Sequence, residues 1–499
     1  MTTAAVVILS PDDDVAVATR ALVPGEAIAE GVVAAAAIPA GHKVAIRPIA
    51  RGQAVVKYGQ VIGEALRDVA PGEHVHVEEL GFGAGDERRA ATPSPAPAVA
   101  PRRATFQGYA RADGRAGTRN YVGVVASVNC STTVCRKIAE IANRDLLPRF
   151  PGIDGFVPIV HGQGCGSTAA GDGPAILRRT LAGYLRHPNF GGSLLIGLGC
   201  EVNQIVLYAA AGREAPVTAF NIQDVGGSRA AVTRALELLE GIAAEASKAT
   251  RVPIDASELK VGLQCGGSDG FSGLTANPAL GAAMDRLVAA GGTAILSETP
   301  EIWGAEHLLT ARATPEVAAK LAARLAWWER YVAATGASLD NNPSPGNKRG
   351  GLTTILEKSL GAVAKGGRSR LVDVVDYAAP VAAHGLVFMD TPGYDPVSAT
   401  GQVAGGANLV VFTTGRGSCF GCRPTPSIKV ASNSDLAARM AEDIDVDAGR
   451  IVSAGVSVDA VGEEIFELIL EVASGRQTMS EAFGYGDDEF VPWHVGAVL

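Results

Sequence analysis

The chain has 499 residues, which is too many for one hydrophobic core, so we expect two or three domains. Apolar residues make up 47% and charged residues 19%, enough to bury a sizeable core, and 61 glycines indicate many tight turns. The net charge of −9, with no basic patch, argues against nucleic acid or an anionic membrane as partner.

The N-terminus "MTTAAVVILSPDDD" has no basic segment, and no run is long and apolar enough to span a membrane. Seven cysteines are an odd number spread through a long chain, which does not resemble a secreted disulfide framework. We therefore expect a cytoplasmic protein with reduced thiols. A glycine-rich chain of this size often forms a homo-oligomer, so we expect one here.

Composition divides the chain into four parts. Residues 1–87 contain short β-like runs between glycine and proline turns, which predicts a small β-rich domain. Residues 88–105 are rich in Ala and Pro without periodicity, which is typical of a linker. Apolar runs then alternate with helical patterns, which predicts an α/β region with mainly parallel sheets, divided into domains at 106–250 and 251–499.

Four apolar runs of the α/β region end at a cysteine, namely Cys130, Cys165, Cys200 and Cys265. Ligands of open α/β sheets bind beyond the carboxyl ends of the strands, so four such strands in one sheet would place the thiols along one edge. Thiolates are soft ligands for iron or zinc, and packing as small apolar side chains is the alternative. For the C-x-x-C pair of Cys419 and Cys422, we favour two loop cysteines over a redox pair.

Histidines form a second group of candidates. His42 lies in a glycine turn, and His74 and His76 are two residues apart, on one face of a strand. Imidazoles placed in this way suit a metal site or an acid/base pair, although an exposed edge strand explains the spacing equally well. His161 follows a strand and precedes Cys165, so we expect it in the crevice, where it would suit proton transfer.

Charged residues near predicted loops complete the set. Glu298 and Glu301 end a strand, where capping of a helix N-terminus is the competing explanation. The stretch "NNPSPGNKRGG" is rich in Pro and Gly, so we expect a loop without regular structure that holds Asn347 and Lys348. Arg416 lies between two glycines, a setting in which a guanidinium can bind a carboxylate bidentately, although a surface turn would look the same.

Several of these stretches together resemble a known family. They are "GYARADGRAGTRNYVGV", "GLGCE", "QCGGSDGFSGLTANPALG", "SETPEIWGAEHLL", "NPSPGNKRGGLTTILEKSLG", "TTGRGS" and "PSIKVASNS". They look like the altronate and galactarate dehydratases, a family of sugar-acid dehydratases, and the N-terminal part is similar to a SAF (antifreeze-like) domain. The ending "GEHVHVEEL" looks more like altronate dehydratase, whereas "SVNCSTTV" and "CFGC" depart from both patterns.

The resemblance implies a reaction and a set of residues. Family members convert hexonic or hexaric acids to 2-keto-3-deoxy acids, with a divalent metal such as Fe²⁺ or Mn²⁺. The matching positions are His42, His161, Cys130, Cys165, Cys200, Cys265, Ser268, Asp269, Glu298, Glu301, Lys348 and Arg416.

The expected roles follow from the chemistry of an elimination. A base removes the C2 proton, an acid protonates the departing C3 hydroxyl, and a cation stabilises the enediolate. We expect Arg416 and Lys348 to hold the carboxylate, and His161 with Glu298 or His42 to transfer protons. Ser268, Asp269 and Asn347 are further candidates for binding substrate, and the metal is expected near the cysteines and histidines, with His74 and His76 as further ligand candidates.

Three alternatives stay open at this point. Within the same reaction type, the substrate could be galactarate, or sulfolactate for a sulfo-lyase. A hydro-lyase of the aconitase type would use three of the four cysteines to hold an iron–sulfur cluster. A protein of a different class would bind a sugar acid without turning it over.

Overall fold

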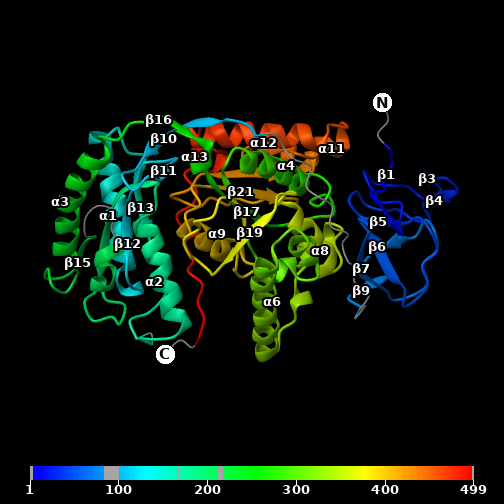
Figure 1. Ribbon diagram of the computed structural model, residues 1–499, viewed down its shortest axis with the longest axis horizontal. Helices are drawn as coiled ribbons and strands as arrows, with labels where there is room; N and C mark the ends of the chain where they lie inside the picture. Colours follow the sequence, from blue (N-terminus) through cyan, green and yellow to red (C-terminus); the bar gives the residue numbers. More distant parts are fainter. Residues whose placement is uncertain (1–3, 84–100, 167, 212–216, 497–499) are drawn as a thin grey trace.

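The structure is a computed structural model of the chain and describes residues 4–83, 101–166, 168–211 and 217–496. Figure 1 shows three regions in a row. The third domain (green to red) lies in the middle, with the N-terminal domain (blue) on one side and the second domain (cyan to green) on the other. The predicted β-rich domain followed by a large α/β region with a parallel sheet is confirmed.

The N-terminal domain consists of short antiparallel strands. They form one sheet in the order β1-β2-β5-β8, another in the order β6-β7-β9, and the pair β3-β4. Val15, Val44 and Ile62 are buried between them. The strands are β1 (Val6–Val7), β2 (Val15–Ala18), β3 (Ala27–Ala29), β4 (Val32–Val33), β5 (Lys43–Ala45), β6 (Ala54–Lys57), β7 (Gln60–Ala65), β8 (His74–Val75) and β9 (Leu80–Gly81).

The second domain is built around a parallel sheet in the order β13-β12-β14-β15. All six residues of β12 are buried, because α1 and α3 cover one face of the sheet and α2 covers the other. A small antiparallel sheet, β11-β10-β16, adjoins it. The elements are β10 (Thr105–Ala110), β11 (Ala116–Gly117), β12 (Tyr121–Ala126), α1 (Asn129–Asp145), β13 (Gly155–Ile159), α2 (Asp172–Leu185), β14 (Phe190–Gly197), β15 (Thr218–Asn221), α3 (Ser228–Ala246) and β16 (Val252–Asp255).

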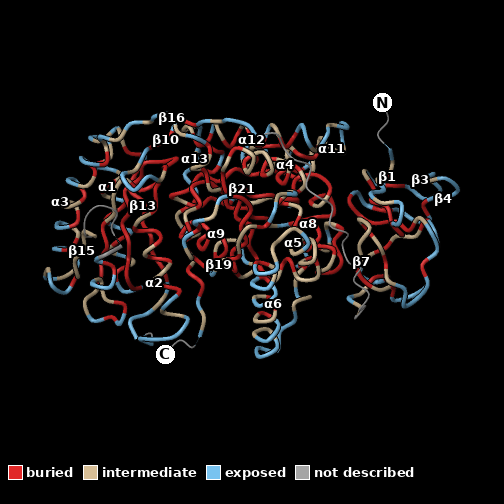
Figure 2. The backbone as a smooth tube through the Cα atoms, in the orientation of Figure 1, coloured by how far each residue is buried: buried red, intermediate tan, exposed pale blue. Residues whose placement is uncertain are grey.

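The third domain contains a seven-stranded parallel sheet in the order β19-β20-β18-β17-β21-β22-β23. Helices α4 and α12 pack against one face and α9 against the other, and Figure 2 shows the buried backbone concentrated there. The strands are β17 (Lys260–Cys265), β18 (Thr293–Leu296), β19 (Leu371–Val375), β20 (Gly385–Met389), β21 (Leu409–Thr414), β22 (Ser427–Ala431) and β23 (Val446–Asp447). The helices are α4 (Ala276–Ala289), α5 (His307–Thr310), α6 (Pro315–Thr335), α7 (Pro345–Arg349), α8 (Ile355–Ala364), α9 (Asp395–Ala404), α10 (Ser434–Arg439), α11 (Arg450–Ser453), α12 (Val458–Ala473) and α13 (Met479–Ala482).

The predicted linker and the predicted loop around Lys348 differ in part from the structure. The predicted linker, residues 88–105, lies mostly outside the described residues, and Thr105 already begins β10. The expectation that "NNPSPGNKRGG" has no regular structure is wrong, because it contains the short helix α7. Pro345 occupies the first helical position, where a missing N–H costs nothing, and the side chain of Ser344 caps the helix.

A buried ion cluster joins the N-terminal domain to the third domain. Nζ of Lys43 and Nζ of Lys57 lie 2.9 Å and 2.7 Å from the two carboxylate oxygens of Glu357 on α8. All three side chains are essentially inaccessible to solvent. Burial alone would raise the pKa of the Glu357 carboxyl, but the two ammonium groups outweigh burial and hold it well below its usual range. The cluster fixes where the N-terminal domain sits.

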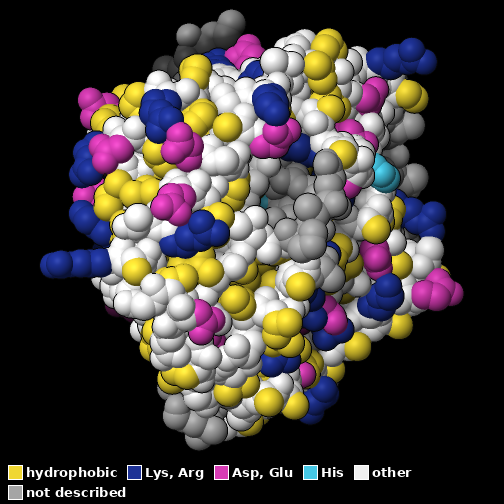
Figure 3. Space-filling model, turned by 90° about the vertical axis from the view of Figure 1, so that its left-hand side faces the viewer, with side chains coloured by type: hydrophobic (Ala, Val, Ile, Leu, Met, Phe, Trp, Pro, Cys, Tyr) yellow, Lys and Arg dark blue, Asp and Glu magenta, His cyan; other side chains and the backbone are white. Residues whose placement is uncertain are grey.

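Within the described residues, no helix combines the length and apolar character needed to cross a bilayer. On the face shown in Figure 3, at the end of the second domain, positive and negative side chains are interspersed. Interspersed charge of both signs is typical of an ordinary solvated surface.

Candidate active site

The carboxyl ends of β17, β21 and β22 bring polar loops together around Asp269. Its Oδ1 accepts hydrogen bonds from the Ser272 backbone N–H (2.9 Å) and the Ser432 hydroxyl (2.7 Å), and its Oδ2 accepts one from Asn433 Nδ2 (2.9 Å). Gly415 leaves room for the carboxylate, because a Cβ there would lie 2.2 Å from Asp269 Cγ. Burial raises the pKa of the Asp269 carboxyl, and these hydrogen bonds partly offset the effect.

Helix α7 lies against this loop. The side chain of Asn347 donates to the Ser268 carbonyl oxygen (2.7 Å) and accepts a hydrogen bond from the Ser344 backbone N–H (2.9 Å). Asn347, one of the predicted substrate-binding residues, thus connects α7 to the loop after β17. The same helix ends at Arg349, whose backbone carbonyl faces the N-terminal domain.

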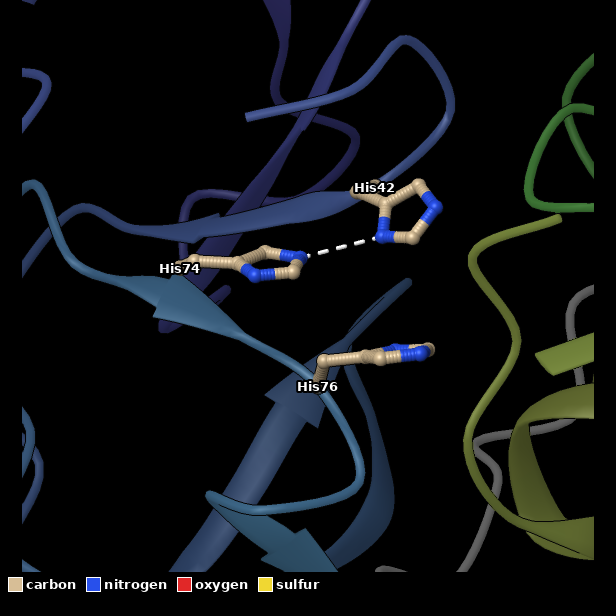
Figure 4. A group of neighbouring side chains, drawn as sticks. All are labelled: His42, His74 and His76. Atoms are coloured by element: carbon tan, nitrogen blue, oxygen red, sulfur yellow. Dashed lines mark hydrogen bonds between the residues drawn. The ribbon is translucent and has the colours of Figure 1, made fainter. Parts of the chain in front are cut away.

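The N-terminal domain contributes three histidines, His42, His74 and His76. Figure 4 shows their side chains pointing the same way, toward the ribbon of the third domain. The rings of His74 and His76 are stacked with centroids 5.5 Å apart, and His42 Nδ1 lies 3.0 Å from His74 Nε2. His42 Nε2 donates to the carbonyl oxygen of Arg349 (3.2 Å).

Glycines let the two domains approach closely beside His42. Gly41, with φ +80°, forms the turn before β5, and its carbonyl oxygen lies 1.9 Å from where a Cβ on Gly270 would be. The same oxygen lies 2.5 Å from the corresponding point on Gly351. Larger side chains at these positions would push His42 away from the third domain.

A cavity of about 560 Å³ lies between these two domains. His42 and Asp269 line it together with Arg349 and Arg416. Arg20 and Arg439 also contribute to the lining. The volume is within the usual range for small-molecule sites, and the guanidinium groups suit a carboxylate ligand.

A second charged cluster is buried beneath the loop after β17. Lys365 Nζ lies 3.1 Å from Cys265 Sγ and 3.2 Å from Glu298 Oε2, and Lys358 Nζ lies 2.7 Å from Glu301 Oε1. Glu298 adopts a left-handed backbone conformation with φ +71°, which is unusual for a residue with a side chain.

Protonation of this cluster follows from its charges. Burial is the larger cause that raises the pKa of Glu298 to about 8, and the Glu301 carboxylate is the next. The same two causes, in the same order, raise the pKa of Asp395 to about 7. The cluster contains three carboxyl groups and two ammonium groups, so it is neutral when one carboxyl group keeps its proton. The groups are those of Glu298, Glu301, Asp395, Lys358 and Lys365. The cluster is closed to solvent in this structure, since Glu298 is only 1% exposed.

Among the described residues, two groups place three ligand atoms within 4.8 Å of one another: the three histidines, and Cys265 with Glu298 and Glu301. The histidines fit a metal ion better. A carbonyl only accepts, so neutral His42 carries its proton on Nε2 and presents the Nδ1 lone pair toward His74. The 3.0 Å between the two nitrogens matches the spacing of about 3 Å expected for adjacent ligands at metal–nitrogen distances of about 2.1 Å.

The protonation of the histidines also fits a metal. Burial lowers the pKa of His42 and of His76 to about 4, and it lowers that of His74 as well, so the rings are neutral near pH 7. His76 Nδ1 is buried and has no hydrogen-bond partner among the described residues. The Cys265 group, in contrast, already faces the ammonium groups of Lys358 and Lys365.

The predicted cysteines do not lie along one edge. Cys130, Cys165 and Cys200 follow strands of the second-domain sheet, whereas Cys265 ends β17 of the third domain. The expectation of a common edge is wrong because both α/β domains contain buried parallel strands of similar appearance. An apolar run alone does not show which sheet its strand joins.

Two further candidates are placed away from the cavity. His161 follows β13 of the second domain, and Figure 1 shows that this domain and the N-terminal domain lie on opposite sides of the third domain. The structure therefore does not bring His161 to His42. Lys348 is on α7 but not among the residues that line the cavity, which include its neighbour Arg349. The pair Cys419 and Cys422 consists of free thiols, the first exposed and the second buried.

Sequence reasoning missed Arg349, Lys358 and Lys365. The sequence "NKRGG" contains both Lys348 and Arg349, but it does not show which of the two side chains lines the cavity. That depends on the helical turn of α7. The two lysines lie on or directly after α8 in an apolar helical pattern, where a buried cation has no signal of its own.

Three family models match consecutive parts of the chain. Residues 4–82 match the altronate/galactarate dehydratase SAF domain, residues 108–247 the second domain of D-galactarate dehydratase/altronate hydrolase, and residues 256–498 the C-terminal D-galactarate/altronate dehydratase domain. The chain belongs to the D-galactarate/altronate dehydratase family. This dehydratase is a carbon–oxygen lyase, as the sequence resemblance implied.

Relatives of this dehydratase match over most of their length. Altronate dehydratase of Escherichia coli strain K12 is 37% identical over 94% of this chain and 95% of its own. Galactarate dehydratase (L-threo-forming) of the same strain is 36% identical over 90% of this chain and 88% of its own. The (2R)-sulfolactate sulfo-lyase subunit beta of Chromohalobacter salexigens is 33% identical over 76% of this chain and 95% of its own.

Proposed function

We propose that this dehydratase converts a sugar acid, D-altronate first among the candidates, to a 2-keto-3-deoxy acid in the cavity between the N-terminal and third domains. The observation that carries the proposal is this shared cavity, where His42 of the histidine cluster, a buried carboxylate and arginines converge. The altronate and galactarate dehydratases among the relatives support a polyhydroxy acid as substrate.

We propose His42, His74 and His76 as ligands of a divalent metal such as Fe²⁺ or Mn²⁺. Bound there, the metal supplies a Lewis acid that stabilises negative charge developing on the substrate. The nitrogen spacing, the neutral rings and the Nε2 hydrogen bond of His42 to the Arg349 carbonyl support this assignment.

The chain's own residues account for binding and proton transfer. Arg416 and Arg349 bind the substrate carboxylate through charge-assisted hydrogen bonds. Asp269 accepts the C2 proton, and its raised pKa makes it a stronger base than an exposed aspartate. The C3–O bond then breaks, the departing hydroxide takes up this proton as water, and the enol tautomerises to the ketone.

Two residues receive roles that differ from the sequence expectation. Glu298 keeps its proton near pH 7 and lies beneath the loop after β17, so it supports that loop through Lys365 and Cys265 and does not contact substrate. Lys348 does not line the cavity, and Arg349 takes its place in holding the carboxylate.

The test combines metal analysis with turnover. The protein is purified anaerobically and assayed for 2-keto-3-deoxy acid formation from altronate, galactarate and sulfolactate, with and without added Fe²⁺ or Mn²⁺. His74→Ala and His76→Ala should each lose most of the bound metal, together with a 10- to 100-fold or larger loss of activity. His384→Ala, at an exposed histidine of the third domain, is the matched control and should keep both.

Two outcomes would contradict the proposal in different ways. Unchanged metal content in the His74 and His76 variants would remove the histidine cluster as the metal site. Ligand binding without turnover of any acid would remove the catalytic assignment and favour a binding protein.

A galactarate dehydratase is the second candidate, because that relative matches nearly as well as the altronate dehydratase of the same strain. A hexaric acid carries a carboxylate at each end, and the cavity offers Arg20 and Arg439 in addition to Arg349 and Arg416. Higher kcat/KM for galactarate than for altronate would select this candidate.

A further inference from the structure

Cys130, Cys165 and Cys200 follow three neighbouring strands of the second-domain sheet. Strands β13 and β14 both pair in parallel with β12, so all three carboxyl ends meet at one edge. Cys130 lies in the first turn of α1 after β12, Cys165 follows β13, and Cys200 follows β14. All three thiols are free and exposed. The topology thus brings three thiols from separate loops to one place.

Backbone hydrogen bonds connect these loops to one another. The Asn129 N–H, beside Cys130, donates to the Gln163 carbonyl oxygen in the Cys165 loop (2.9 Å). The Val202 N–H, in the Cys200 loop, donates to the carbonyl oxygen of Cys165 itself (3.0 Å). Each thiol-bearing loop is therefore linked to at least one of the others.

The buried carboxylate of Glu201 fixes the conformation of the loop that carries Cys200. Glu201, 2% exposed, accepts hydrogen bonds from the Ser127 hydroxyl at the end of β12 (2.6 Å) and from the Gly199 N–H (2.7 Å). The Asn203 side chain donates to the Ser127 carbonyl oxygen (2.9 Å). These bonds position the loop that carries the exposed thiol.

The thiols are close enough to influence one another. The Cys130 side chain makes a hydrogen-bonding contact with Cys165 and interacts electrostatically with Cys200. Negative charge on more than one of these sulfurs is unfavourable without a cation between them. Gln223 Nε2 contacts Cys200 Sγ at 3.5 Å, but a neutral amide does not supply that charge.

The spacing distinguishes between a single ion and a cluster. Three thiolates on one ion, with metal–sulfur bonds of about 2.3 Å, lie about 4 Å apart. Among the described residues, the groups whose ligand atoms all lie within 4.8 Å of one another do not include these three thiols. At least one pair of the three sulfur atoms is therefore farther apart than 4.8 Å, which suits an inorganic cluster with its thiolates on different irons better than a single ion.

We propose that Cys130, Cys165 and Cys200 bind a 4Fe–4S cluster in the second domain, with one iron left without a protein thiolate. Cys265, which ends a strand of the other sheet, takes no part. The site lies on the opposite side of the third domain from the histidine cluster, so it does not depend on the function proposed above.

The test is anaerobic reconstitution of the full chain with Fe²⁺ and sulfide, followed by desalting. We expect a broad absorbance near 400 nm and about four iron and four acid-labile sulfide per chain, beyond any iron at the histidines. Cys130→Ser, Cys165→Ser and Cys200→Ser should each lose most of the sulfide and the absorbance. Cys419→Ser, at an exposed thiol of the third domain, is the matched control and should keep them.

Two results would overturn the proposal. One is a wild-type protein with iron but no acid-labile sulfide. The other is equal sulfide content in the Cys130, Cys165 and Cys200 variants and in the Cys419 control, since it would show unspecific deposition on thiols. Thermal unfolding of each variant checks that the serine substitutions leave the fold intact, and loss of metal in His74→Ala with sulfide retained would separate the two sites.

Discussion

Asp269 has two oxygens in different settings. Oδ1 accepts four hydrogen bonds, from two backbone N–H groups and the hydroxyls of Ser272 and Ser432, whereas Oδ2 accepts one from Asn433. The first set fixes the orientation of the carboxylate. The second oxygen keeps accepting capacity in a residue that lines the cavity, which is what a proton acceptor needs.

Asp269→Asn should lower kcat by about 100- to 10,000-fold, since the amide keeps the shape of the side chain but cannot take a proton. The Kd for substrate should change much less. A base works when deprotonated, and burial raises the pKa of Asp269, so kcat/KM of the wild type should fall on the acid side at a higher pH than for an exposed aspartate. Stopped assays across pH and direct binding measurements check both points.

The control for this prediction is Asp488→Asn, at an 82% exposed aspartate of the C-terminal segment. It should leave kcat and its pH profile unchanged. An Asp269→Asn variant with wild-type kcat would show that another group removes the proton.

At the scale of single elements, α7 is the smallest part with a large effect on the site. Its five residues contact the loop after β17 through the Asn347 side chain, and they contact the N-terminal domain through the Arg349 carbonyl oxygen. A helix this short depends on its cap, because it has few hydrogen bonds of its own. The reciprocal Ser344 and Asn347 capping box supplies it.

Ser344→Ala should raise KM several-fold while kcat changes little, because the lost cap, worth about 1 kcal/mol, loosens the segment that carries Arg349. Steady-state kinetics separate the two parameters. Ser457→Ala, which removes the N-cap of α12, should cost similar stability and leave KM unchanged. Equal KM values in both variants would contradict a positioning role for α7.

Contacts within one element could be predicted from the sequence, whereas contacts between distant elements could not. The H-x-H spacing predicted that His74 and His76 share a face, but only the structure shows that His42, from a turn 32 residues earlier, lies in contact with His74. The strand-end cysteines were recognisable one by one, yet their division between two sheets depends on packing between distant segments. Lys365 contacts Cys265 across 100 residues of sequence, and no local pattern carries such a pair.

At the scale of the whole molecule, the site exists only while the N-terminal domain is docked. The cavity has one wall from each domain, so the orientation of the blue domain in Figure 1 determines whether His42 meets Arg349. Lys43 directly follows His42 and is paired with Glu357, which couples the histidine cluster to the buried ion cluster. Docking and metal geometry are thus expected to change together.

Glu357→Gln should weaken docking strongly, because it leaves the ammonium groups of Lys43 and Lys57 buried without a carboxylate, a loss of about 3–5 kcal/mol. Hydrogen exchange should rise in β5 and β6 but not in β12, and metal affinity should fall. Glu73→Gln removes an exposed ion pair with Arg67 in the same domain and should cost at most about 1 kcal/mol. Unchanged exchange in β5 of the Glu357 variant would show that other contacts hold the domain.

The same carboxylate predicts how docking responds to pH. The folded-state pKa of Glu357 is held below its unfolded value of about 4.3, so its stabilisation is fully present above that pH and is lost as the pH falls through the lower range. The free energy of unfolding of the wild type should therefore decline below about pH 4.3. In Glu357→Gln this part of the decline should be missing, since an amide does not titrate. Denaturant unfolding of both proteins between pH 7 and pH 3 measures the difference, and parallel curves would mean that the ion cluster does not control docking.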